Sequence, residues 1–291
     1  MTQVTPSLSI KPSASAPDSS MGRILLDMGK LKPEDGERIL RLQKEQGLRF
    51  GEAAQRLGLV TAADIEMVLA RQFDYPYLQR GQGNFADELV AAYAPFSPQV
   101  EMLRAVRSQL MLRWFNGERK ALAVLAVNPG EGASLFAANL AVVFSQLGEQ
   151  TLLVDANLRQ PRQSQIFSLD TKQGLSDILV GRADLDVIAK VPSFVDLSVL
   201  PCGTLPPNPQ ELLSRSTFLQ VNLEVSNRYD VVLYDVAAFS SGADALAIAA
   251  RLGGVLLVVR QNSTALDDIA VVSEQLGRVG AEVVGTVLVD Y

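Results

Sequence analysis

The stretch from residue 99 to residue 291 alternates short apolar runs with amphipathic segments of helical period. The apolar runs lie at residues 121–127, 151–155, 197–200, 231–235, 255–260 and 283–288. Most are apolar along their whole length, which is typical of strands whose two faces are both covered, as in a parallel sheet. Helical segments at residues 133–147, 209–225, 243–250 and 265–279 separate them. This alternation predicts a doubly wound α/β domain built on a parallel sheet.

The composition excludes several kinds of chemistry. The chain has no histidine, which excludes mechanisms that need an imidazole base and histidine-rich metal sites. Its net charge of -6 argues against an extended nucleic-acid surface, which needs clustered Lys and Arg. Cys202 is the one cysteine, so no disulfide can form within the chain, and we expect a cytoplasmic protein. No apolar run reaches the ~18 to 20 residues of a membrane helix, so we expect no transmembrane segment.

The N-terminal region contains an internal repeat. Residues 1–20 are rich in Ser and Pro, and we expect a disordered tail there. Residues 21–79 carry three pairs of residues at a constant spacing of 29: Gly22 and Gly51, Gly29 and Gly58, Gln43 and Gln72. The repeat predicts two similar helical units, in which a short helix ends at Gly29 or Gly58 and a second helix begins at Pro33 or after Thr61. Thr61 is the predicted N-cap.

The repeated pattern G-x-x-L-x-x-x-G-x-L, followed by L-x-x-Q, resembles the N-terminal (MshEN-like) module of type II secretion and pilus assembly ATPases. Some members of that family bind cyclic di-GMP through paired motifs with an Arg before the first glycine. Arg49 stands at this position in the second copy, and Met21 occupies it in the first copy, with Arg23 on the other side. The resemblance implies cyclic di-GMP as a ligand. From the residues alone, the alternative is a small helical adapter whose glycines only turn corners.

Residues 80–98 contain Gly, Asn, Ala and Pro without clear periodicity. We interpret them as a linker, which leaves residues 99–291 as the second domain.

A glycine-rich turn follows the apolar run at residues 121–127 and leads directly into a helix. It reads Asn128-Pro129-Gly130-Glu131-Gly132-Ala133-Ser134. Backbone N–H groups and the positive end of the helix converge on an anion in such a turn, which predicts a phosphate-binding loop, or P-loop. The expected nucleotide contacts come from Gly130, Glu131, Gly132, Ala133, Ser134 and Leu135. A complete P-loop has Lys before the Ser to neutralise the β- and γ-phosphates, and here that residue is Ala133.

Two aspartates end predicted strands, Asp155 and Asp235. Acidic residues at the carboxyl ends of strands in this fold face the ligand crevice, where they can hold Mg²⁺ directly or through water. Ser134 is the expected third metal ligand through its hydroxyl. The alternative for each carboxylate is a solvated or capping group at the end of a strand.

Together these motifs resemble those of bacterial tyrosine kinases (BY-kinases) of the polysaccharide co-polymerase system. The matching stretches are P-G-E-G-x-S, V-D-A-N-L-R-Q-P and Y-D-x-x-x-x-D. Combined with the N-terminal repeat, the pattern is most similar to the EpsG type, which is encoded with exopolysaccharide genes. The resemblance implies ATP and Mg²⁺ as cofactors and Asp155, Asp235 and Arg159 as catalytic residues. The candidates to replace the missing Lys in part are Arg159 and an Arg from the E-x-x-R-x-x-R helix of a neighbouring subunit.

The resemblance also implies partners. Such kinases regulate exopolysaccharide polymerisation, export and chain length together with a membrane co-polymerase, which would hold a cytoplasmic protein at the inner membrane. Glu101, Arg104 and Arg107 reproduce the E-x-x-R-x-x-R helix that mediates ring assembly in the family, so a homo-oligomer is implied. From spacing alone, these residues only line one face of a helix with charges.

Four departures from the family pattern bear on activity. Ala133 replaces Lys, Asn157 replaces the second acid of the D-x-D motif, and Val236 and Ala237 replace a Thr-Pro pair. The sequence stops at Tyr291 without the tyrosine-rich tail of the family. Loss of the Lys alone predicts a rate loss of roughly ten- to a thousandfold.

Two further hypotheses come from other functional classes. One is a pseudokinase scaffold whose N-terminal module senses cyclic di-GMP or a partner protein. The other is a partitioning or septum-site ATPase, which is disfavoured because Asn128-Pro129-Gly130 lacks the signature lysine of that class. Tyr75, Tyr77 and Tyr291 are the tyrosines expected to be exposed.

Overall fold

The computed structural model describes residues 21–72, 78 and 83–290. The chain divides into two compact units, Met1–Tyr75 and Pro76–Tyr291, and each is described by itself. The predicted tail at residues 1–20, residues 80–82 of the predicted linker, and Tyr75, Tyr77 and Tyr291 lie outside the described residues. No described helix is long and apolar enough to cross a membrane.

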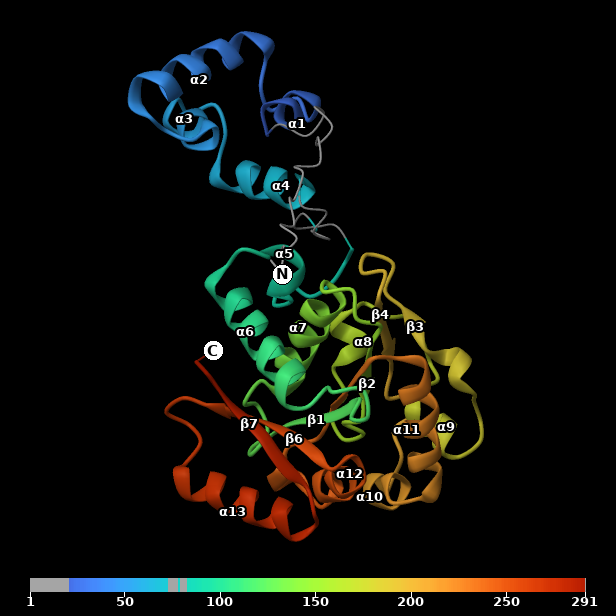
Figure 1. The fold of residues 1–291 in the computed structure, drawn as a ribbon. Helices are drawn as coiled ribbons and strands as arrows, with labels where there is room; N and C mark the ends of the chain where they lie inside the picture. Colours follow the sequence, from blue (N-terminus) through green and yellow to red (C-terminus); the bar gives the residue numbers. More distant parts are fainter. Residues whose placement is uncertain (1–20, 73–77, 79–82, 291) are drawn as a thin grey trace, which may run out of the picture. The chain divides into compact units, whose positions relative to one another are not determined.

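The larger unit is built on a seven-stranded sheet with the strand order β3-β4-β2-β5-β1-β6-β7 (Figure 1). Its strands are β1 (Ala121–Ala126), β2 (Thr151–Asp155), β3 (Ala189–Lys190), β4 (Leu197–Leu200), β5 (Val231–Asp235), β6 (Gly254–Arg260) and β7 (Glu282–Val289). All neighbours pair parallel except β3 and β4. The predicted doubly wound parallel sheet is therefore confirmed. The sequence did not predict β3, because two residues leave no periodic pattern.

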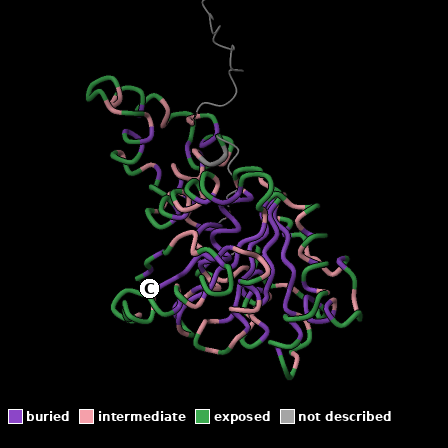
Figure 2. The backbone as a smooth tube through the Cα atoms, turned by 60° about the horizontal axis from the view of Figure 1, so that its bottom comes forward, coloured by how far each residue is buried: buried purple, intermediate pink, exposed green. Residues whose placement is uncertain are grey.

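Alternate residues of each strand point to opposite faces of the sheet, and both faces are covered. On one face, Leu122 and Val124 of β1 pack with α5, α6 and α7. On the other face, Ala123 and Leu125 pack with residues of α11, α12 and α13. Figure 2 shows the result, with buried residues running along the strands of this unit. This double covering explains why the strand sequences are apolar throughout.

The helices of the larger unit are α5 (Val90–Tyr93), α6 (Pro98–Arg113), α7 (Ala133–Ser145), α8 (Gln163–Ile166), α9 (Leu175–Leu179), α10 (Pro209–Leu213), α11 (Ser216–Arg228), α12 (Asp244–Leu252) and α13 (Leu266–Arg278). The helix predicted at residues 209–225 is in fact two, α10 and α11. The break lies at Arg215, whose backbone is extended (φ -71°, ψ 155°) and after which α11 begins.

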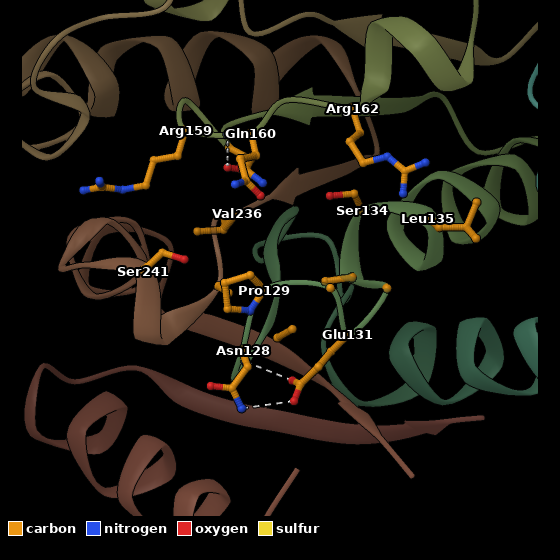
Figure 3. Close-up of a pocket in the computed structure, with 16 residues that line it drawn as sticks. Asn128, Pro129, Glu131, Ser134, Leu135, Arg159, Gln160, Arg162, Val236 and Ser241 are labelled. Carbon is orange, nitrogen blue, oxygen red and sulfur yellow. Dashed lines mark hydrogen bonds between the residues drawn. The ribbon is translucent and has the colours of Figure 1, made fainter. Parts of the chain in front are cut away.

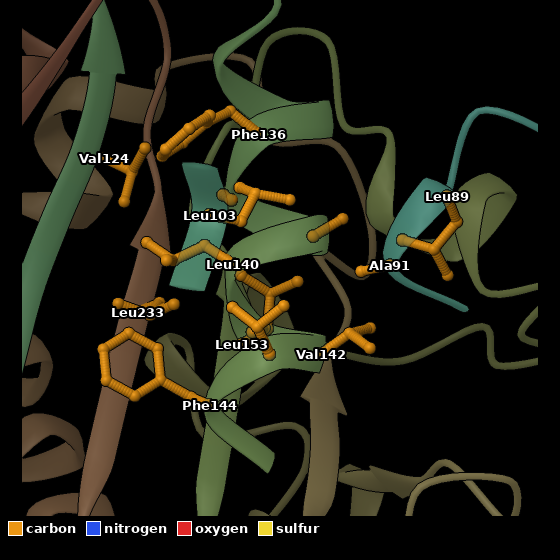
Figure 4. Packing of buried hydrophobic residues seen from close by; sticks show 14 of the residues in the cluster. Leu89, Ala91, Leu103, Val124, Phe136, Leu140, Val142, Phe144, Leu153 and Leu233 are labelled. Carbon is orange, nitrogen blue, oxygen red and sulfur yellow. The ribbon is translucent and has the colours of Figure 1, made fainter. Parts of the chain in front are cut away.

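Helix α7 carries the P-loop serine and lies in the middle of one core cluster (Figure 4). Its Phe136, Leu140 and Phe144 are buried among strand residues such as Val124 and Leu153. The P-loop is thus anchored on one of the most buried elements of the molecule.

The segment interpreted as a linker, residues 80–98, differs from that prediction where it is described. Leu89 and Ala91 are fully buried in the α7 cluster. Asn139 of α7 accepts a hydrogen bond from the Ala91 N–H (2.8 Å), and its amide donates to the carbonyl of Glu88 (3.4 Å). Helix α5 is only four residues long, too short for a periodic signal, so this packing could not be predicted from the sequence pattern. Residues 83–98 therefore belong to the larger unit.

Trp114, the residue after α6, packs against the sheet. Its indole N–H donates to the carbonyl of Ala121 (2.9 Å), and its ring lies directly over Gly254 at the start of β6. A Cβ added at Gly254 would lie 2.2 Å from a ring carbon, so this position has room only for glycine.

The N-terminal unit contains α1 (Met21–Asp27), α2 (Pro33–Gln46), α3 (Phe50–Arg56) and α4 (Ala62–Gln72). As expected at the ends of the two short helices, Gly29 and Gly58 follow α1 and α3 with φ of +67° and +68°. Thr61 is the N-cap of α4, because its hydroxyl accepts from the Asp64 N–H (3.2 Å) while the Asp64 carboxylate accepts from the Thr61 N–H (2.9 Å). Such a capping box satisfies two backbone donors that the helix leaves free.

The two repeats are interleaved. Helix α1 of the first repeat packs against α4 of the second, and α3 of the second packs against α2 of the first. Equivalent side chains also cross over, because the Phe50 ring lies against Gly22 and the Met21 sulfur lies against Gly51. Each glycine thus leaves space for a side chain of the other repeat.

Candidate functional site

The P-loop connects β1 to α7 at the carboxyl edge of the sheet. Gly130 and Gly132 have φ of +83° and +86°, which residues with a side chain rarely adopt, and Gly132 is the N-cap of α7. Ala133 and Ser134 then form the first turn of the helix. This geometry aims backbone N–H groups and the helix N-terminus into one space.

The carboxylate of Glu131 does not face that space. It accepts hydrogen bonds from the Asn128 N–H (2.9 Å) and from the Thr264 hydroxyl (2.7 Å), and its side chain is buried. Glu131 therefore ties the P-loop to the turn after β6. Only its backbone N–H remains for the nucleotide contact that the sequence predicts.

A cavity of about 540 Å³ opens in front of the P-loop (Figure 3). Its walls include Asn128 to Leu135 from the P-loop, residues after β2, and residues after β5: Asn157, Arg159, Gln160, Arg162, Val236, Ala238 and Ser241. All three segments follow the carboxyl ends of adjacent central strands, where ligands bind in open α/β sheets. The six predicted P-loop residues all line it.

Asp155 and Asp235 lie beneath the cavity floor. They end β2 and β5 directly opposite each other in the sheet register, and both are fully buried. The Ser134 hydroxyl donates to Asp235 Oδ1 (3.0 Å), so one of the two aspartates contacts the P-loop. The structure thus brings together the three predicted metal ligands, although neither carboxylate is itself part of the cavity wall.

Gln163 links the two aspartates, and sequence reasoning missed it. Its amide donates to Asp235 Oδ2 (2.7 Å) and to the carbonyl of Ser134 (3.0 Å). Asp155 Oδ2 accepts from the backbone N–H groups of Gln163 (2.9 Å) and Arg162 (3.1 Å). Asp155 Oδ1 has no hydrogen-bond partner among the described residues. This oxygen is therefore available to a proton or a cation.

Burial perturbs both carboxyl groups. Burial, and then the neighbouring Asp235 charge, raises the pKa of Asp155 well above its usual range. Burial also raises the pKa of Asp235 to about 6, although hydrogen bonds from Gln163 and Ser134 and the charge of Arg162 oppose the shift. Two adjacent carboxylates in a buried site favour a bound proton, because it removes one of the two negative charges. A divalent cation would neutralise the same negative charge in place of the proton.

Arg159 is held away from the P-loop. Its guanidinium donates to both oxygens of Asp244 at the start of α12 (2.5 and 3.1 Å), and Asp244 is almost fully buried. These hydrogen bonds raise the pKa of Arg159 above its usual value. Figure 3 shows the side chain extending away from Ser134. Arg159 lines the cavity as predicted, but its charge is already neutralised by Asp244, a partner that no sequence pattern indicated.

Arg162 is a second arginine of the cavity wall. Its guanidinium lies 3.9 Å from the Glu88 carboxylate, and both side chains are largely exposed. The sequence pattern did not mark it, because it lies outside the motifs. Asn157, in place of the second acid of the D-x-D motif, accepts from the Gln160 N–H (3.0 Å) and so shapes the turn after β2.

The residues present fit a magnesium-nucleotide complex. Among the described residues, no three His, Cys, Asp or Glu side chains form a metal site on their own. Ser134 and Asp235 would instead supply hard oxygen ligands, with the open oxygen of Asp155 behind them, and phosphate oxygens would complete the shell, as Mg²⁺ prefers. The cavity has the size expected of a small-molecule site.

The predicted assembly residues lie on α6, which begins after the N-cap Ser97. Arg104 forms an ion pair with Glu101, whose side chain is exposed. Arg107 donates to the carbonyl of Val143 on α7 (2.6 Å). Arg107 therefore binds within the chain. The motif is not only a charged helix face exposed to solvent, which was the alternative from spacing alone.

Comparison with known proteins reveals similar sequences and structures. The chain is 31% identical to the tyrosine-protein kinase YwqD of Bacillus subtilis over 200 residues, which are 69% of this chain and 84% of that protein. It superposes on the kinase domain of the Escherichia coli tyrosine kinase ETK with a TM-score of 0.67 and 28% identity, covering 69% of this chain and 79% of that one.

The septum site-determining protein MinD of Pyrococcus horikoshii, solved with Mg-ADP, has the same fold at a TM-score of 0.50 and 24% identity, over 58% of this chain and 69% of that one. No family model matches the chain.

Proposed function

The chain belongs to the bacterial tyrosine-protein kinase family, and from this premise we propose that it binds ATP with Mg²⁺ and transfers the γ-phosphoryl group to a tyrosine hydroxyl. The observation that carries the proposal is the contact between Ser134 and Asp235 beneath the P-loop cavity. It supports the proposal because a hydroxyl and a carboxylate in contact can share one magnesium ion at the phosphates.

We assign roles on that basis. The backbone N–H groups of the P-loop bind the phosphates, with the positive end of α7 behind them. Ser134, Asp155 and Asp235 hold the metal ion. Asp155 is also the proposed acceptor for the proton of the acceptor hydroxyl, because its Oδ1 has no hydrogen-bond partner among the described residues. Arg159 positions the turn after β2 through Asp244.

The acceptor tyrosine belongs to another polypeptide or to a part of the chain outside the described residues. Of the tyrosines that the structure describes, Tyr93 and Tyr234 are buried in the core and Tyr229 is half-buried between α11 and β5. None of these three reaches the cavity wall.

The biological role that we propose is regulation of exopolysaccharide polymerisation and export with a membrane co-polymerase, as an EpsG-type kinase that this partner holds at the inner membrane. Assembly through α6 is part of the proposal. Glu101 is the exposed member of the motif, so Glu101→Lys would lower the oligomer mass in light scattering. An unchanged mass would contradict assembly through this helix.

Phosphate transfer from labelled ATP to a glutamate-tyrosine copolymer tests the enzymatic function. The wild-type chain should label the polymer, and Asp235→Asn should not. Asp230→Asn is the matched control, because Asp230 is an exposed carboxylate just before the same strand. If calorimetry finds no ATP binding at millimolar concentration with Mg²⁺ present, the proposal is wrong.

A second candidate is a non-catalytic scaffold, which Ala133 favours because it lacks the lysine charge. ATP binding without transfer would support it. In this form the N-terminal unit is a MshEN-like module that senses cyclic di-GMP or a partner protein. Its groove is lined by Met21, Gly22, Leu26, Leu40 and Phe50, among others. Titration with cyclic di-GMP tests the ligand, with Arg49→Ala as the variant and Arg56→Ala as the control.

A further inference from the structure

The cavity in front of the P-loop has two described cationic side chains in its wall, Arg159 and Arg162. Phosphate groups that enter such a cavity carry several negative charges, and backbone N–H groups alone do not neutralise them. With no lysine at Ala133, these two arginines are the described side chains of the wall that can add positive charge to that of the magnesium ion in the proposed function.

Arg159 is poorly placed for this task. Its two hydrogen bonds to Asp244 use the fork of the guanidinium, and Asp244 is almost fully buried. Moving Arg159 to a phosphate would leave a buried carboxylate without its cation, which is strongly unfavourable. Gly242 also packs against the Arg159 guanidinium, where an added Cβ would lie 2.8 Å from Nη2.

Arg162 has a hydrogen-bonded backbone and an exposed guanidinium. Its backbone N–H is bound to the buried Asp155 carboxylate (3.1 Å), which holds the start of the side chain at the cavity wall. Among the described residues, the one ion pair of its guanidinium is with the exposed carboxylate of Glu88, at 3.9 Å. Exposed pairs of this kind contribute little to stability, so a phosphate can replace Glu88 at small cost.

The position of Arg162 is also suitable. Figure 3 shows its guanidinium on the side of the cavity that holds Ser134 and Leu135, opposite to the direction of Arg159. Its charge acts on Asp235, the carboxylate that Ser134 contacts. An arginine can present two parallel N–H donors to phosphate oxygens, which a lysine cannot.

We propose that Arg162 replaces the missing P-loop lysine and binds the β- and γ-phosphate oxygens of ATP, with Glu88 holding it while no nucleotide is present. The inference rests on the proposed nucleotide function. It assigns to the turn after β2 a charge that P-loop proteins usually place on the loop itself.

Calorimetric titration with ATP, ADP and AMP tests this proposal. Arg162→Gln should weaken ATP and ADP binding by about 10- to 100-fold, the range of a charge-assisted hydrogen bond. AMP, which lacks both phosphates, should bind as before. The dependence of ATP affinity on salt should also become shallower, because one ionic contact is gone.

Arg228→Gln is the matched control. Arg228 pairs with Glu224 on α11, and the exposed fractions of the two side chains, 51% and 55%, are close to the 45% and 58% of Arg162 and Glu88. The two substitutions change net charge equally, but Arg228 lies before β5, at the opposite end of that strand from Asp235. It should leave nucleotide affinity unchanged.

Two more variants make the result decisive. Glu88→Gln removes the competing carboxylate from an exposed position and should tighten ATP binding severalfold. Ala133→Lys in the Arg162→Gln background should restore the lost affinity.

The outcomes separate this proposal from the proposed function. If the wild type and Arg162→Gln bind ATP with equal affinity, the role of Arg162 is overturned and the proposed function stands. Absence of ATP binding in the wild type would instead contradict the proposed function.

Discussion

Arg159, on the turn after β2, and Asp244, at the start of α12, form an ion pair through two hydrogen bonds of 2.5 and 3.1 Å. The pair joins two segments of the cavity edge that are far apart in the sequence. It gives Arg159, in the V-D-A-N-L-R-Q-P stretch, a structural role that can be separated from any role in phosphate binding.

Arg159→Met should lower the free energy of unfolding by about 3 kcal/mol, because it leaves a buried carboxylate without its cation. Urea denaturation of the nucleotide-free protein measures this change. The double variant Arg159→Met with Asp244→Asn should recover part of the loss. If Arg159 served phosphate binding alone, the single substitution would leave the stability of the nucleotide-free protein unchanged.

Ala133→Lys should tighten ATP binding at least about tenfold, because an ammonium group is restored beside the phosphates. Calorimetry in the presence of Mg²⁺ measures the affinity. Ala133→Met is the control, since it adds a side chain of similar length without charge, and circular dichroism shows whether both variants fold. Equal affinities for the Lys and Met variants would mean that the loop does not direct this position toward the nucleotide.

Gly254→Ala should destabilise the larger unit by about 1 to 3 kcal/mol, because the new Cβ would overlap the Trp114 ring that a hydrogen bond to Ala121 holds in place. Gly277→Ala, in α13, is the matched control. A Cβ there meets nothing within 4 Å, so the change should be neutral or stabilising by about 0.5 to 1 kcal/mol. Thermal unfolding compares the two. Equal midpoints would show that the Trp114 ring moves aside freely.

The N-terminal unit should lose stability in acid. Hydrogen bonds from Thr61 outweigh burial and lower the pKa of Asp64 to about 2, and Lys30 adds an ion pair at 2.9 Å. A lowered folded-state pKa contributes stability above the unfolded-state value near 4, and this contribution is lost as the pH falls from about 4 to 2.

Hydrogen exchange of α4 amides in the full chain measures this loss. Thr61→Val should shrink the pH dependence. A protection profile that stays flat between pH 4 and pH 2 in the wild type would contradict the assignment.

Sequence reasoning located the strands and the P-loop because both depend on local patterns. The position of Asp155 and Asp235 at the ends of β2 and β5 followed from the apolar runs before them, and the register places them side by side. The glycine pairs likewise predicted the N-terminal repeat, because Gly29 and Gly58 end helices through their own backbone conformation.

The contacts between distant side chains could not be predicted in this way. Gln163 reaches Asp235 across 72 positions, and Arg159 reaches Asp244 across 85. No local periodicity indicates such pairs. The sequence therefore predicted Arg159 as an unpaired charge and did not identify Gln163 or Arg162 as site residues. Helix α5 and strand β3 were missed for a different reason, since they are too short to show a period.

The interleaving of the N-terminal repeats has a consequence for how such a unit could arise. Because α1 packs on α4 and α3 on α2, a lone copy of the motif has its complementary surface only on a second molecule. When two copies are joined in one polypeptide, the contact between two molecules becomes a contact within one chain. The unit's stability then no longer depends on protein concentration, as that of an obligate dimer does.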